Sequence, residues 1–220
     1  MLACEFFTVE TVRLQTLFVL FFIELQTRRG FVAGCTEHPS AAWVTQQARH
    51  LAWHLEDESR RPTRLVRERD AKFPASCDTV SRAAGARVVR TLPQAPRANA
   101  VAERWVGTGR RECLDGVLIF GRHHLEPVLE EDVAPYNTAR PHRALQLRAP
   151  LARGQPPRPA PCPEGVIRRE RLGGLSHEYE SVAACCHQRV AHISVPHSLH
   201  PILHNASVYC KRPRPADGDG

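Results

Sequence analysis

The segment that most restricts the possible fold is residues 14–25, a run rich in Thr, Phe, Val and Ile. Its longest apolar stretch, residues 17–23, lies between Arg13 and Glu24. This stretch is too short for a membrane span, which needs roughly 18–20 apolar residues. β-forming residues over this length instead predict a strand buried on both faces at the centre of a sheet. We therefore expect a sheet-based core and no membrane partner.

The segments around this run predict a mixed sheet covered by helices. Residues 3–9 and 31–35 are expected to flank the central strand in an antiparallel meander, with a turn at residues 27–30. Further strands are predicted at residues 64–67 and 87–92, and helices at residues 40–55, 77–84, 98–114 and 123–133. This order indicates an α/β fold with a mixed five-stranded sheet flanked by helices.

The composition changes after residue 150. Six prolines fall within residues 150–163, a density typical of an extended linker. Residues 1–150 are therefore predicted to form the folded domain, and residues 151–220 an irregular, Pro-rich linker with a largely disordered tail. The tail is rich in His and Cys, but the spacing of these residues fits no zinc finger.

The cysteines and the N-terminal charges indicate a reducing compartment. Glu5 and Glu10 lie where a secretory signal would carry positive charge. The eight cysteines form no Cys-x-x-Cys pair. Without export, we expect these thiols to be reduced.

Basic residues are concentrated in one part of the chain. The whole sequence has 30 basic and 23 acidic residues, a net charge of +7. Residues 60–111 alone contain thirteen basic and four acidic residues. Such a zone suits a phosphate-binding surface around a metal site, but charge alone favours a solvated, Arg-rich face.

Three acidic residues occupy positions where a sheet and a helix can bring them together. Glu5 is on the first predicted strand, Glu68 follows the fourth, and Glu103 is on the third predicted helix. Clustered carboxylates repel one another, and two divalent cations are the usual means of keeping such a cluster ionised.

Four stretches of sequence resemble motifs of one family. They are Ala-Cys-Glu-Phe-Phe at residues 3–7, Glu-Arg-Asp-Ala-Lys-Phe at 68–73, the segment 95–105 around Glu103, and Tyr-Asn-Thr-Ala-Arg-Pro-His-Arg-Ala-Leu at 136–145. Together they resemble the catalytic core of the retroviral-integrase superfamily, in the form found in bacterial insertion-sequence transposases. Residues 168–179 are similar to a tail that follows this core in related transposases.

The resemblance implies a ribonuclease-H-like fold and a specific chemistry. The family cleaves DNA and transfers strands with a DDE triad and two Mg²⁺ or Mn²⁺ ions. Glu5 and Glu68 stand where the family has Asp, and Glu103 matches the family's Glu. Each Glu adds one methylene and shifts its carboxylate by roughly 1 Å, which can cost on the order of 10²-fold in rate. We therefore expect a partial or degenerate transposase that lacks the family's N-terminal helix-turn-helix region.

The same resemblance implies partners and further site residues. DNA, as element ends and target, is the expected partner, together with self-association or assembly with an intact transposase in the bacterial cytoplasm, at the nucleoid. The candidate DNA-contacting residues are Lys72, Arg97, Asn99, Arg104, Arg110 and Arg111. Solvation of the cations and helix capping by Asn99 remain alternatives, as do packing roles for Arg140 and His142. Alternative functions are a catalytically inactive DNA-binding relic or regulator, and a pseudogene product that folds poorly.

Overall fold

The computed structural model describes residues 1–91, 96–152, 166–174 and 176–181. The strands are β1 (Leu2–Glu10), β2 (Thr16–Glu24), β3 (Gly30–Thr36), β4 (Arg64–Arg67), β5 (Arg87–Arg90), β6 (Val166–Arg171) and β7 (Ser176–Ser181). The α-helices are α1 (Ala41–Asp57), α2 (Ala75–Ala83), α3 (Pro96–Glu112) and α4 (Arg122–Thr138). Short 3₁₀ helices are η1 (Leu114–Gly116), η2 (Arg143–Leu145), η3 (Pro150–Ala152) and η4 (Leu172–Gly174).

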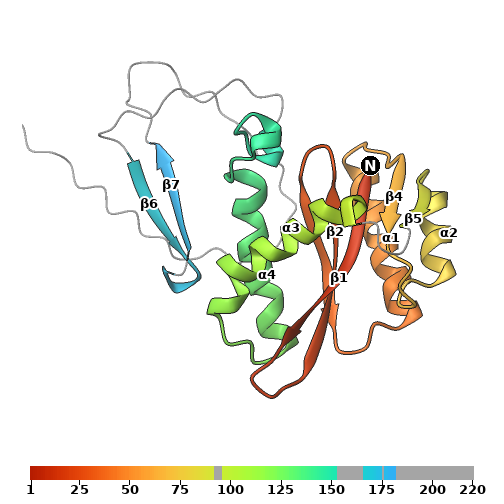
Figure 1. Cartoon of the computed structure of the whole chain (residues 1–220), viewed down its shortest axis with the longest axis horizontal. Helices are drawn as coiled ribbons and strands as arrows, with labels where there is room; N and C mark the ends of the chain where they lie inside the picture. The colour runs from red at the N-terminus through yellow and green to blue at the C-terminus, as the bar shows by residue number, and fades with distance from the viewer. Residues whose placement is uncertain (92–95, 153–165, 175, 182–220) are drawn as a thin grey trace, which may run out of the picture. The chain divides into compact units, whose positions relative to one another are not determined.

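Five strands form the mixed sheet that the sequence predicts. Their order is β3-β2-β1-β4-β5 (Figure 1). The β1–β2 and β2–β3 pairs are antiparallel, which confirms the meander, whereas β1–β4 and β4–β5 are parallel. The parallel pairs require the crossovers that α1 and α2 supply. The three-layer α/β/α arrangement follows from this order.

Alternate residues of β1 contribute to separate hydrophobic cores on the two faces of the sheet. Ala3 and Phe7 pack with buried residues of α3 and α4. Leu2 and Cys4 pack with buried residues of α1 and α2. This division follows from the two-residue period of a strand. Strand β2 is apolar almost throughout because both of its faces are covered. It lies between β3 and β1, so β1, and not the predicted apolar strand, is at the centre of the sheet.

Most predicted boundaries shift by one or a few residues, and for two of them the structure shows the physical reason. Strand β2 begins at Thr16 because Leu14, at φ 59°, belongs to the preceding turn and is 86% exposed. Helix α4 continues to Thr138 past Pro135, which as a helix breaker would favour an earlier end. Its last turn is held by tertiary contacts: the Asn137 amide donates to the Gly30 carbonyl oxygen at 2.8 Å and accepts from the Gly30 N–H at 2.9 Å.

Strands β6 and β7 form an antiparallel hairpin that the sequence analysis placed in the irregular tail. The hairpin contains Arg168–Glu170 and Tyr179, which lie in the stretch similar to a transposase tail. It carries polar residues with little apolar alternation, so the period that reveals strands is weak. It lies in the compact unit Met1–Ala184. Residues 182–220 lie outside the described part, so their predicted disorder stays a prediction.

The structure also tests the state of the cysteines and the length of the helices. The described cysteines, Cys4, Cys35, Cys77 and Cys113, are all buried free thiols. In the described residues, every helix falls short of the length and apolar character that a membrane crossing demands.

Candidate active site

The β1–β4 pairing brings Glu5 and Glu68 to the same level of the sheet. Cys4 pairs with Arg67 in parallel register, and Glu5 and Glu68 are the next residues on their respective chains. Adjacent strands lie about 4.8 Å apart. Side-chain alternation places Glu5, between Ala3 and Phe7, on the face covered by α3 and α4. Two positions that are 63 residues apart in the sequence thus become neighbours.

Glu103 is on α3, the helix that covers this same face. Ala102 and Trp105 anchor the helix in the core, and the Trp105 ring stacks on Phe21 with 4.5 Å between centroids. Farther along, the Arg110 guanidinium donates to the Thr8 carbonyl oxygen at 2.6 Å and ties α3 to β1. Glu103 follows Ala102 directly but is exposed. The helix therefore carries Glu103 on the correct side of the sheet.

The three carboxylates predicted to bind metal, those of Glu5, Glu68 and Glu103, are not gathered into one ligand group. Among the described residues, no three His, Cys, Asp or Glu side chains are placed to hold a metal ion. Like-charged carboxylates repel when no cation lies between them, and Glu68 and Glu103 reach into solvent. The donor chemistry suits Mg²⁺, but the placement does not fit a shared metal pair. Their role as metal ligands stays a prediction.

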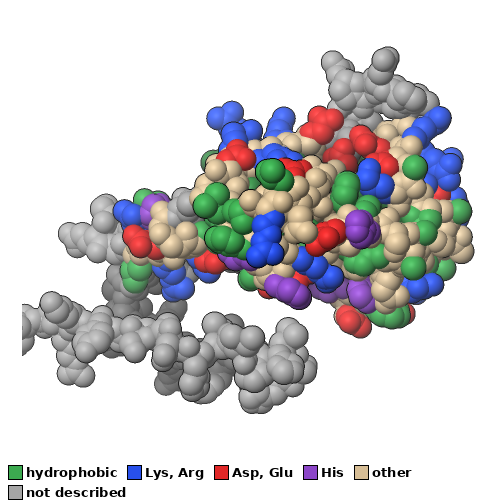
Figure 2. All heavy atoms as spheres, turned by 90° about the horizontal axis from the view of Figure 1, so that it is seen from below, with side chains coloured by type: hydrophobic (Ala, Val, Ile, Leu, Met, Phe, Trp, Pro, Cys, Tyr) green, Lys and Arg blue, Asp and Glu red, His purple; other side chains and the backbone are tan. Residues whose placement is uncertain are grey.

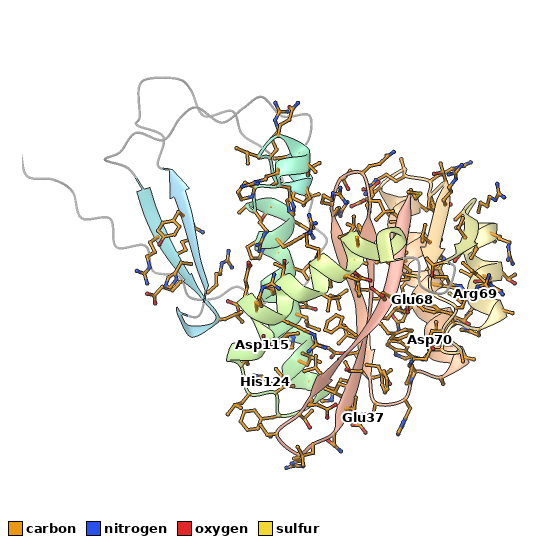
Figure 3. The ribbon with its side chains drawn as sticks, in the orientation of Figure 1. Glu37, Glu68, Arg69, Asp70, Asp115 and His124 are labelled. Carbon is orange, nitrogen blue, oxygen red and sulfur yellow. The ribbon has the colours of Figure 1, made fainter. Side chains whose placement is uncertain are left out.

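Asp70 is the only other acidic residue in the motif at residues 68–73, and it is already paired. Its carboxylate accepts from the Lys72 ammonium at 2.7 Å and from the Lys72 backbone N–H at 2.9 Å. Partial burial opposes ionisation of Asp70, but these hydrogen bonds outweigh it and lower its pKa. Figure 3 shows Glu68, Arg69 and Asp70 following β4 beside β1.

A buried ion pair that the sequence analysis missed supports the end of β4. The Arg67 guanidinium makes two hydrogen bonds to the Asp78 carboxylate, at 2.8 and 2.9 Å, and both side chains are almost fully buried. A third Arg67 nitrogen donates to the Glu68 backbone carbonyl at 2.8 Å. Burial opposes ionisation of Asp78, yet the hydrogen bonds from Arg67 and Arg90 lower its pKa. Arg67 therefore fixes the backbone at the predicted second carboxylate.

The predicted DNA-contacting residues have different surroundings. Lys72 is paired with Asp70, and Arg110 supports the fold through Thr8. Arg104 and Arg111 are exposed and remain available to a ligand. The side chains of Arg97 and Asn99 lie outside the described part, so their roles stay predictions.

The closing motif at residues 136–145 has a packing role. The Arg140 guanidinium pairs with the Glu112 carboxylate, which joins the end of α4 to the end of α3. The His142 ring packs edge-on against Tyr136, with 4.9 Å between centroids. The Tyr136 ring in turn packs edge-on against Trp105, with 6.1 Å between the ring centroids. These contacts support the packing alternative for Arg140 and His142.

A family model matches part of this chain in sequence, and solved structures match the chain in fold. Residues 84–150, which include β5, α3 and α4, match the family model described as Integrase core domain. Comparison with curated proteins found no match. The chain in the simian T-cell lymphotropic virus intasome in complex with the PP2A regulatory subunit B56 gamma is 11% identical, with a TM-score of 0.57. The match covers 81% of this chain and 66% of that one.

Two further solved structures match with lower TM-scores. The Mos1 transposase catalytic domain with raltegravir and Mg is 12% identical over 60% of this chain and 70% of that one, with a TM-score of 0.48. The HTLV-2 integrase catalytic core domain with magnesium is 6% identical over 65% of this chain and 89% of that one, with a TM-score of 0.43.

The fold comparison supports the ribonuclease-H-like architecture predicted from the sequence, and the family model supports the resemblance on which that prediction rested. Residues 84–150 are thus similar in sequence to the integrase core domain family, and the chain is similar in fold to the integrase of the intasome structure.

Proposed function

We propose that the chain acts on DNA, as an integrase-type core for strand cleavage and strand transfer in transposition. The observation that carries the proposal is the parallel register of β1 and β4, which makes Glu5 and Glu68 neighbours beneath the helix that bears Glu103. Independent segments of the sequence thus supply three carboxylates to one face of an integrase-type fold. The integrase core match over residues 84–150 supports the same assignment.

The proposed catalytic residues are Glu5, Glu68 and Glu103, and Mg²⁺ or Mn²⁺ is the proposed cofactor. Arg67 would hold the strand end at Glu68 through its bond to the Glu68 carbonyl. Glu in place of Asp lengthens two of the three side chains by one methylene. A misplacement of roughly 1 Å costs on the order of 10²-fold in rate, so we expect weak activity.

A second function, DNA binding without catalysis, is favoured by one observation. The described carboxylates do not form a group that could hold a metal ion. A chain that keeps the fold and its basic surface but has lost the metal site would bind DNA and interfere with an intact transposase by mixed assembly. Self-association on paired DNA ends is part of both proposals, and sedimentation with and without those ends tests it.

The deciding experiment is a nicking assay on a duplex that carries the element's ends, with Mg²⁺ or Mn²⁺. If the chain is catalytic, the parent should nick the duplex only when the metal is present, and the E103Q variant should not nick it. The matched control is E37Q: Glu37 is exposed and lies well apart from Glu68 (Figure 3). Nicking that survives in E103Q would refute the assigned site.

The E5D/E68D double variant separates the two functions. If the longer side chains limit the rate, this variant should nick DNA faster than the parent by about 10²-fold or more. If the variant and the parent both bind DNA and neither nicks it, the DNA-binding function is the correct one.

A further inference from the structure

A polar pocket of about 310 Å³ opens beside the ends of β4 and β5. It lies outside the predicted carboxylate site, because Arg67 and Glu68 are successive residues and their side chains alternate between the two faces of the sheet. The residues that line it are Arg67, Arg69, Asp70, Phe73 and Arg90.

The pocket and its partners carry an excess of positive charge. Asp78 is shared by Arg67 and Arg90, with the Arg90 contact at 2.8 Å. Asp70 is occupied by Lys72. Within the described residues, the Arg69 guanidinium has no acidic partner. Arg82 also lies 3.8 Å from the Asp78 carboxylate. Five cations and two carboxylates therefore meet here, which leaves three positive charges unneutralised. In Figure 2, basic side chains lie at the end of the molecule where Figure 1 places α2 and β5, and others are spread over the same face.

One side of the pocket is buried and fixed, and the other is exposed to solvent. Arg67 is 3% exposed, is held by Asp78, and lies over the Phe73 ring at 5.3 Å. The Arg90 side chain is 54% exposed, and Arg69 is exposed. A pocket with the fixed Arg67 side chain on one side and the solvent-facing guanidinium groups of Arg69 and Arg90 on the other suits an anion that is larger than a single carboxylate.

We propose that this pocket binds a phosphodiester group of a nucleic-acid backbone, with Arg69 and Arg90 contacting its oxygens. Guanidinium groups match phosphate in two-point hydrogen bonding and are less strongly hydrated than ammonium groups. Phe73 is the single apolar side chain in the lining, so an apolar ligand has little to contact. A phosphate held here would place the nucleic-acid strand across the end of β4, one residue from Glu68. The identity of the ligand as DNA rests on the proposed function, whereas the phosphate chemistry does not.

The first test measures how salt weakens the binding of a DNA duplex in EDTA. Each neutralised phosphate contributes about 0.9 to the slope of log Kobs against log salt. Because the pocket is proposed to neutralise one phosphate, the R69Q/R90Q variant should lower that slope by about 0.9, and R69Q alone by no more than that. The control R13Q/R49Q removes the same charge from two other exposed arginines and should keep most of the slope. An unchanged slope in R69Q/R90Q, or an equal loss in the control, overturns the proposal.

The second test uses inorganic phosphate, and it keeps the pocket separate from the DNA assignment. Phosphate should raise the melting temperature of the parent and of R13Q/R49Q, relative to chloride at equal ionic strength, but not that of R69Q/R90Q. R69Q serves as a second variant because Arg69 has no acidic partner in the described part of the chain, so its loss leaves the ion pairs seen there in place. A parent that fails to bind DNA contradicts the proposed function. If the parent fails to bind DNA but phosphate still raises its melting temperature more than that of R69Q/R90Q, the pocket takes free phosphate and the nucleic-acid assignment is wrong. If phosphate does not raise the melting temperature of the parent either, the pocket proposal fails as well.

Discussion

Replacement of Asp78 by Asn tests how the fold tolerates a buried cation without a counter-ion. Asp78 is 1% exposed, and its carboxylate accepts two hydrogen bonds from Arg67, which is 3% exposed. The substituted amide would keep the shape of the side chain but remove its negative charge, and Arg67 cannot lose its proton to compensate. The charge of Arg67 would then be left without a partner in the interior.

The expected loss is large relative to the stability of a domain. Breaking a buried ion pair by removing one partner costs about 3–5 kcal/mol, out of about 5–15 kcal/mol for a typical domain. Arg82 and Arg90 also contact Asp78, but their side chains are more than half exposed, so each adds at most about 1 kcal/mol. For a unit of this size, the loss corresponds to a melting temperature about 6–20 °C lower.

The assay is urea unfolding followed by circular dichroism, with thermal melting as a check. The matched control is D70N, because the Asp70–Lys72 pair is partly exposed and should be worth at most about 1 kcal/mol. The R67M/D78L variant replaces both partners with apolar residues and should recover most of the stability lost in D78N. The reasoning is refuted if D78N costs no more than D70N, or if the double variant is less stable than D78N.

Three other perturbations test separate parts of the structure. The hydrogen bond from Arg29, aided by its charge, lowers the pKa of Glu58 to about 2. The stability that this pair contributes is therefore present above about pH 4.5 and is lost as the pH falls toward 2. The urea midpoint of E58Q should fall less steeply with decreasing pH than that of the parent, and parallel curves would contradict this. Burial raises the pKa of Asp132 to about 6. Because the folded state then holds the proton more tightly than the unfolded state, the free energy of unfolding should fall as the pH rises from about 4 through 6. This decline should be absent in D132N, and a decline that persists in D132N would exclude Asp132 as its cause. A Cβ at Gly30 would lie 2.7 Å from the Trp105 Nε1, so G30A should lower the free energy of unfolding by about 1–3 kcal/mol, whereas a neutral result in thermal melting would show that the indole moves freely.

The strands and helices of the core were predictable because their signals are local. The apolar run at residues 17–23 requires burial on both faces, and β2 is the strand between β1 and β3. Helix-forming periodicity located α1 and α3 to within a few residues. The motifs around Glu5, Glu68 and Glu103 were also readable, because residue type and order along the chain are properties of the sequence itself.

The hairpin and the end of α4 were not predictable from such signals. In β6 and β7, charged and polar residues leave little apolar alternation to detect. The proline at position 135 argues locally for a helix end, but the Asn137 contacts with Gly30 outweigh it. Packing between distant segments supplies this energy, and a local pattern does not record it.

The sequence by itself determined the strands and helices of the five-stranded core, apart from the end of α4, and the acidic positions that a strand or helix of this core would carry. Only the tertiary structure decided that Glu5 and Glu68 directly follow a parallel pair of residues on neighbouring strands, that Arg67 is buried against Asp78, and that the described carboxylates form no metal-binding group of three. The physical reason is that strand register and side-chain partners depend on contacts between residues far apart in the chain. The free energy of those contacts is defined only once the two core faces of the sheet are packed.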